Sequence, residues 1–165
     1  MRTLLISATC ALTFAATLAA HATPDFTGSW IRDEARSTSR TTGPAPAASG
    51  TSLPIGDTVI QHTPLDLTIS NEIMGMAITY RYKLDGSESV NRNGAMVQTT
   101  HSHWNGTQLV TEGIDTQSTS QGQAAWTIKA TRMLDTTGHF IVDTTSTDAH
   151  GVVTTTHQVF TKSPR

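Results

Sequence analysis

The sequence predicts an all-β protein, an up-and-down antiparallel β-barrel of about eight or nine strands. About one residue in five is threonine, a β-branched residue that favours strands over helices. Apolar and polar residues alternate through most of the chain, and short turn signals separate the alternating segments. Because turns this short leave no room for crossover helices, consecutive strands are expected to pair and the sheet to close on itself.

The composition narrows the functional classes. The 165 residues include 11 Lys+Arg and 13 Asp+Glu, and charged residues make up 15% of the chain. A net charge of −2 excludes a strongly basic surface, so we expect no nucleic-acid partner. The length is that of one domain with a single core. The one cysteine, Cys10, precludes an internal disulfide.

The first 22 residues have the pattern of a signal peptide. Arg2 is followed by an apolar run from Leu4 to Ala20, and Ala20-His21-Ala22 is a small-x-small cleavage pattern. We expect cleavage after Ala22, export to the periplasm or the medium, and a barrel domain over 23–165. The run is short and Pro24 follows it, so no membrane span is expected in the mature chain.

The first strand precedes a loop. Phe26, Gly28 and Trp30 alternate with polar residues, and a single helical turn is expected at 33–36. The sequence from 37 to 57 is rich in Ser, Thr, Gly, Pro and Ala, and it predicts a flexible loop.

The later strands follow at regular intervals. Alternation predicts strands at 65–73 and 76–84, and then at about 87–92, 95–104, 107–116, 123–134, 139–147 and 152–161. Asp85-Gly86, Asn93-Gly94 and Asn105-Gly106 are two-residue hairpin turns. Alternation alone leaves open which face of 95–104 points inward.

Four short motifs carry a resemblance to a known family. They are Asp25-Phe26-Thr27-Gly28-Ser29-Trp30, Tyr82-Lys83-Leu84-Asp85-Gly86, Trp104-Asn105-Gly106-Thr107-Gln108-Leu109 and Gln158-Val159-Phe160-Thr161-Lys162. Their order and spacing resemble lipocalin-like, calycin-type barrels, and in particular a group of small secreted bacterial proteins with no assigned function. The resemblance implies a lipocalin-like barrel over 25–162. It also implies that Gly28 and Trp30 form a plug at one end, with Trp30 beneath Arg132 or Lys162.

A barrel of this size either is filled by side chains or holds one small ligand. We expect an apolar lining with tyrosine hydroxyls, suited to a small hydrophobic or amphipathic ligand. The alternative is a packed interior in a periplasmic or extracellular docking protein that binds no ligand. The expected lining residues are Trp30, Leu67, Ile69, Ile78, Tyr80, Tyr82, Trp104, Trp126, Ile128 and Phe140.

Metal binding and catalysis are weaker interpretations. His101 and His103 share one strand face and could chelate a metal ion if a third ligand, such as His62, His139 or His157, came from a neighbouring strand. The alternative is two polar residues on a solvated strand, and no acid at matched spacing supports a metal site. There is no Gly-x-Ser-x-Gly nucleophile motif or phosphate-binding loop, so we expect no cofactor and do not favour an enzyme. An enzyme using His101 or His103 as a base is a third alternative. The sequence makes no prediction of oligomeric state.

Overall fold

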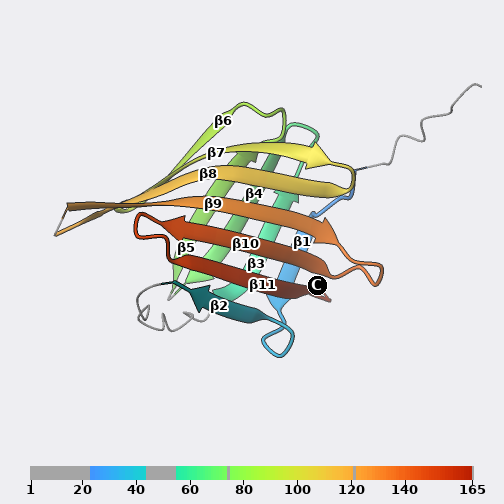
Figure 1. Ribbon diagram of the computed structural model, residues 1–165. Coiled ribbons are helices and arrows are strands. Elements are labelled where there is room, and N and C mark those ends of the chain that lie inside the picture. The colour runs from blue at the N-terminus through green and yellow to red at the C-terminus, as the bar shows by residue number, and fades with distance from the viewer. Residues whose placement is uncertain (1–22, 44–54, 74, 121, 165) are drawn as a thin grey trace, which may run out of the picture.

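The protein is an all-β, nearly closed antiparallel barrel, as the sequence predicts (Figure 1). The computed structural model describes residues 23–43, 55–73, 75–120 and 122–164. The expected signal peptide at 1–22 and most of the expected loop at 37–57 lie outside these ranges. Within them, the strands form one 11-stranded sheet, slightly more strands than expected.

The strands follow an up-and-down order. Neighbours in the sheet run β5-β4-β3-β1-β11-β10-β9-β8-β7-β6, and β2 pairs with β11 off this path. Gly86, Gly94 and Gly106 have positive φ angles, which confirms the three predicted tight turns. The bounds are β1 Gly28–Arg32, β2 Thr38–Thr42, β3 Ile55–His62, β4 Asp66–Ile73, β5 Met76–Lys83, β6 Glu88–Asn93, β7 Met96–Asn105, β8 Gln108–Thr119, β9 Gly122–Leu134, β10 Phe140–Asp148 and β11 Val153–Lys162.

The start of the expected loop is a strand. β1 and β2 lie one after the other along β11, with Trp30 opposite Lys162 and Thr38 opposite His157. Between them the Ser37 hydroxyl donates to the Asp33 carbonyl (2.7 Å) and accepts from the Val159 N–H (3.1 Å). Composition predicts a loop here, but the free edge of β11 provides the partner that turns a Thr-rich segment into a strand.

Side chains of β6 close the seam of the barrel between β5 and β6, the two ends of the strand order. The Arg81 N–H donates to the Asn91 side-chain oxygen (2.7 Å), and the Asn91 amide donates back to the Arg81 carbonyl (3.1 Å). The Lys83 N–H donates to the Ser89 hydroxyl (2.8 Å). Asn91 and Ser89 are both buried, so they replace the backbone ladder that would otherwise join these strands.

The hydrophobic core fills one end of the barrel, called here the packed end. Trp30 is 1% exposed, and its indole N–H donates to the Phe26 carbonyl (2.9 Å). The Phe140 ring lies 5.1 Å from the Phe26 ring and 5.5 Å from the Trp30 ring. The whole core cluster is Phe26, Trp30, Ile60, Leu67, Ile69, Tyr82, Leu84, Leu109, Phe140 and Phe160.

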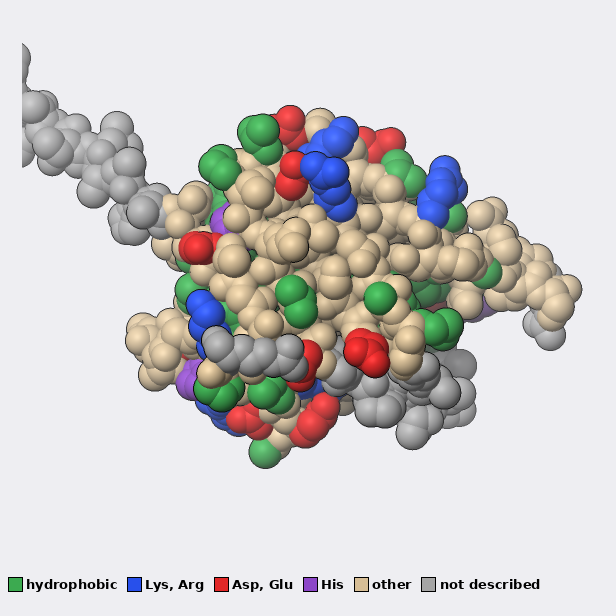
Figure 2. Space-filling view, turned by 180° about the vertical axis from the view of Figure 1, so that it is seen from behind, with side chains coloured by type: hydrophobic (Ala, Val, Ile, Leu, Met, Phe, Trp, Pro, Cys, Tyr) green, Lys and Arg blue, Asp and Glu red, His purple; other side chains and the backbone are tan. Residues whose placement is uncertain are grey.

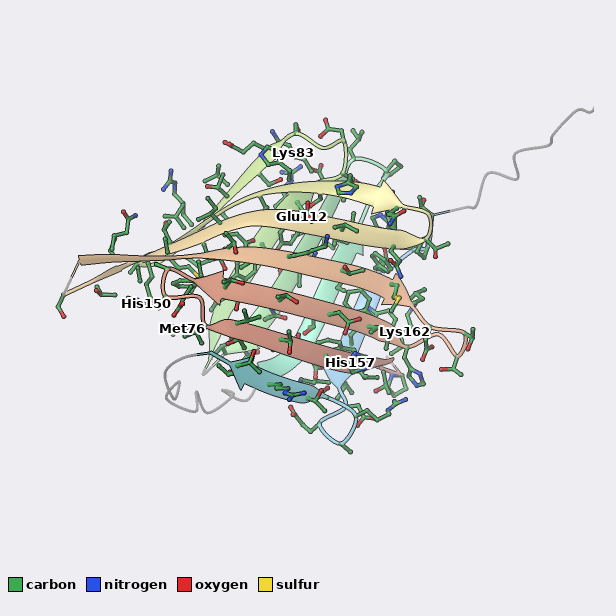
Figure 3. All side chains as sticks on the ribbon, in the orientation of Figure 1. Met76, Lys83, Glu112, His150, His157 and Lys162 are labelled. Atoms are coloured by element: carbon green, nitrogen blue, oxygen red, sulfur yellow. The ribbon has the colours of Figure 1, made fainter. Side chains whose placement is uncertain are left out.

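The opposite end, the hairpin end, carries the β4–β5, β6–β7, β8–β9 and β10–β11 turns. Met76 and His150 lie there, and Lys162 lies at the packed end (Figure 3). The β8–β9 hairpin projects beyond the rest of the barrel (Figure 1). On the face seen in Figure 2, charged side chains of both signs are scattered over a mostly uncharged surface. The described residues include no helix with the length and hydropathy to cross a bilayer.

Replacing Asn91 should open the seam. Asn91→Ala removes two hydrogen bonds to the β5 backbone, so the free energy of unfolding in urea should fall by about 1–3 kcal/mol. Arg92→Ala changes the next, outward-facing and exposed residue of β6 and serves as the matched control. Equal stabilities of the two variants would contradict the role given to Asn91.

His62 should make the packed end sensitive to acid. Its ring stacks on Phe26 (5.5 Å), and its Nδ1 accepts from the Phe26 N–H (3.4 Å). Burial lowers the pKa of His62 below the ordinary value of 6.5, although Asp25 opposes this shift. The folded state therefore favours neutral His62, and this contribution to stability should be lost as the pH falls below that value. The melting temperature of wild type should therefore fall more steeply from pH 7 to about pH 5 than that of His62→Phe.

Candidate ligand-binding site

The barrel contains a partly open cavity of about 300 Å³ next to the packed end. This volume lies at the lower limit of small-molecule sites, which span about 300–1,000 Å³. The interior is therefore not completely filled by side chains. Six strands contribute to the lining, which consists of Thr58, Ile69, Asn71, Tyr80, Tyr82, Arg132, Phe140, Val142, Thr144, Gln158 and Phe160.

The structure places the expected lining residues at three levels along the barrel. Ile69, Tyr80, Tyr82 and Phe140 line the cavity. Trp30 and Leu67 are buried in the core of the packed end, and Trp104 packs against that core. Ile78, Trp126 and Ile128 are half-buried nearer the hairpin end. Alternation indicates which face of a strand points inward, but not the level at which a side chain lies along the barrel.

Several lining residues were not in the expected set. Val142 and Thr144 follow Phe140 at intervals of two, and Phe160 and Gln158 lie opposite Phe140 and Val142 on β11. Their parity with Phe140 would have identified them. Arg132 was expected in the plug and instead lines the cavity.

Arg132 is the buried cation of the site. It is 6% exposed, and its Nη1 donates to the Thr111 hydroxyl (2.8 Å). Its guanidinium carbon lies 4.7 Å from the centre of the Tyr82 ring. Among the described residues, no carboxylate lies within ion-pair distance of Arg132. The cation over the Trp30 ring is Lys162, at 5.6 Å, which is one of the two partners that the resemblance implied.

Arg132 lies over Tyr82 rather than Trp30 because of the strand register. It is opposite Leu109 on β8 and Val142 on β10, and Phe140 lies nearer the packed end, opposite Leu134. The guanidinium is thus placed at the boundary between the aromatic core and the cavity.

Two stacked tyrosines form the wall beside Arg132. The rings of Tyr80 and Tyr82 are 6.4 Å apart and nearly parallel, at 10°. Burial raises the pKa of both phenols, and for Tyr80 the charge of Asp115 adds to this effect. Both side chains are therefore neutral at physiological pH and keep a hydroxyl hydrogen that can be donated.

The inner face of β6, β7 and β8 is polar. The structure settles the face of β7: Trp104 packs against the core, and His101 and His103 are exposed on the outside. The Ser102 hydroxyl is 2.8 Å from that of Thr111, which extends the network held by Arg132. The buried polar residues of these strands are Ser89, Asn91, Gln98, Thr100, Ser102, Thr111 and Asp115.

The histidines considered for a metal site are spread over the molecule. His101 Nδ1 lies 3.1 Å from the Gly86 carbonyl oxygen. His62 lies beside Phe26 at the packed end, and His139 and His157 hydrogen-bond to Asp135 (3.0 Å) and Asp143 (2.6 Å). The described chain holds no group of three or more His, Cys, Asp or Glu residues arranged to bind a metal ion. The third ligand that a metal site at His101 and His103 would need does not join them within the described chain.

Comparisons with known proteins support the fold. No protein-family model and no curated sequence matches the chain. A solved structure described as "REP1-NXSQ fatty acid transporter" is similar, with a TM-score of 0.54 and 12% sequence identity. The match covers 84% of this chain and 96% of the other. At this identity it shows a shared barrel architecture, consistent with a lipocalin-like barrel.

The hydrogen bond between Thr111 and Arg132 should contribute more to the free energy of unfolding when the Arg132 charge is present than when it has been removed. Thr111→Val leaves a buried guanidinium without this acceptor, so it should lower the free energy of unfolding by about 1–3 kcal/mol. In an Arg132→Met background the same change should cost clearly less, because no buried charge remains. Urea unfolding of the two single variants and the double variant measures this difference. An equal cost of Thr111→Val in both backgrounds would show that the two residues are not coupled.

Proposed function

We propose that this protein binds a small amphipathic molecule with an acidic head group inside its barrel. The observation that carries the proposal is Arg132, a buried cation that lines the cavity with no carboxylate partner among the described residues. A buried charge is costly unless it is paired and hydrogen-bonded. An anionic group of a ligand would provide that pairing.

The rest of the cavity suits the body of such a ligand. Ile69, Phe140, Val142 and Phe160 offer apolar surface, which favours an alkyl or other hydrophobic segment. The Tyr82 hydroxyl next to Arg132 adds a donor for the acidic head. Similarity to the fold of a fatty acid transporter supports the same class of ligand.

We further propose that the protein acts outside the cytoplasm. The pattern at 1–22 supports export, and the motifs that begin with Asp25-Phe26 support kinship with small secreted bacterial proteins. The ligand would then be one that the cell meets in the periplasm or the medium.

The alternatives have less support. A docking protein with a packed interior would not contain a cavity of about 300 Å³. A general base at His101 or His103 would act on the outer surface, away from the cavity, because both side chains face outward.

Binding of decanoate should depend on Arg132. Arg132→Met removes a charged hydrogen-bonding partner, so decanoate affinity measured by calorimetry should fall roughly 10- to 100-fold. Affinity for decanol should change little, because the apolar contacts remain.

Arg32→Met is the matched control. Like Arg132, the Arg32 side chain is largely buried, with 9% exposed. Unlike Arg132, it pairs with Glu34 (3.4 Å) and does not line the cavity. This variant should bind decanoate as wild type does. No binding of decanoate to wild type, or equal losses in the two arginine variants, would contradict the proposed function.

A further inference from the structure

Three buried oxygen atoms on the inner face of β7 and β8 lack hydrogen-bond partners. They are the side-chain carbonyl oxygen of Gln98, the hydroxyl of Thr100 and Oδ1 of Asp115. The exposed fractions of these residues are 7%, 0% and 8%. Buried polar groups are normally hydrogen-bonded, so three unpartnered oxygens on one sheet face require an explanation.

The three residues are direct neighbours in the sheet. Gln98 lies opposite Asp115, and Thr100 lies opposite Gly113. A Cβ at Gly113 would lie 2.0 Å from the Thr99 carbonyl oxygen and 2.8 Å from the Thr100 methyl group. The absence of a side chain at 113 thus lets β8 approach β7 closely at Thr100.

All three unpartnered atoms of the cluster can accept hydrogen bonds, and the Thr100 hydroxyl can also donate one. Oδ1 of the Asp115 carboxylate is buried and has no hydrogen-bond partner. The free groups are therefore a carboxylate oxygen, an amide oxygen and a hydroxyl. Such a set is complementary to a ligand group that donates hydrogen bonds.

The cluster faces the barrel interior beside the cavity, although its three residues are not among those that line it. Asp115 is close enough to Tyr80 and Tyr82, both lining residues, for its negative charge to raise the pKa of both phenols. Arg132 is held at Thr111, four positions before Asp115 on the same strand. At roughly 3.3 Å per residue this separation is about 13 Å, a span that a medium-length alkyl chain covers.

We propose that Gln98, Thr100 and Asp115 form a second subsite that binds a hydrogen-bond-donating group, a hydroxyl or protonated amine, carried by the ligand at the end away from its acidic head. This inference rests on the proposed function, because it assumes that the acidic head lies at Arg132. The preferred ligand is then a bifunctional amphiphile rather than a simple fatty acid.

The test compares decanoate with ω-hydroxydecanoate and ω-aminodecanoate by calorimetry. Wild type should bind at least one of the two substituted acids about tenfold more tightly than decanoate, as one hydrogen bond to a charged group allows. The hydroxyl and amine probes distinguish the two kinds of donor. Asp115→Asn and Thr100→Val should each reduce the preference to about twofold or less.

Matched controls keep the result interpretable. Thr99→Val alters the adjacent residue, whose side chain points to the other face of β7, and should keep the preference. Burial raises the pKa of Asp115, so the folded state favours the protonated carboxyl group. The stability that this preference provides is fully present below the ordinary pKa of 3.8 and is lost as the pH rises through the folded-state pKa. Asp115→Asn should therefore melt no lower than wild type at pH 7, which excludes misfolding as the cause of weaker binding.

Equal affinities for all three acids in wild type, or a preference that survives in both Asp115→Asn and Thr100→Val, would overturn the second subsite and leave the proposed function intact. Failure of all three acids to bind wild type would overturn the proposed function and the second subsite together.

Discussion

A guanidinium enclosed in a β-barrel sets the conditions that the rest of the interior must meet. Arg132 is buried beside Tyr82 and donates to Thr111, and the described residues give it no carboxylate partner. The position follows from the register of β9, which places Arg132 at the inward-facing position next to the aromatic core. On the packed-end side of Arg132 the barrel is filled by side chains, and on the hairpin-end side the cavity and the polar inner face begin.

The fold can leave this space open because stability comes from elsewhere. The packed end concentrates the large apolar side chains, and pairing of β1 with β11 brings the two ends of the described chain into one sheet. At the seam, Asn91 and Ser89 replace a backbone ladder with side-chain hydrogen bonds. An interior with orphaned polar atoms is costly, and such costs are typical of sites kept for binding rather than for stability.

Sequence patterns predicted those parts of the structure that depend on local chemistry. Alternation identified most strands, and the Asp-Gly and Asn-Gly pairs identified three turns, because both signals arise within a few residues. Long-range pairing was beyond such patterns. The strand at Thr38–Thr42 exists because β11 offers an edge, and Arg132 lies over Tyr82 because of register. Parity placed Trp30 and Tyr80 on the same inner surface, yet one is core and the other lines the cavity.

The central claim is that the cavity holds an acidic amphiphile. Native mass spectrometry of the protein, isolated gently from the compartment in which it accumulates, tests this directly. We expect an added mass that is released on denaturation and identified in negative-ion mode as a small organic acid with an alkyl or comparable apolar body. Protein that carries no such mass, and that takes up no decanoate when it is added, would contradict the account.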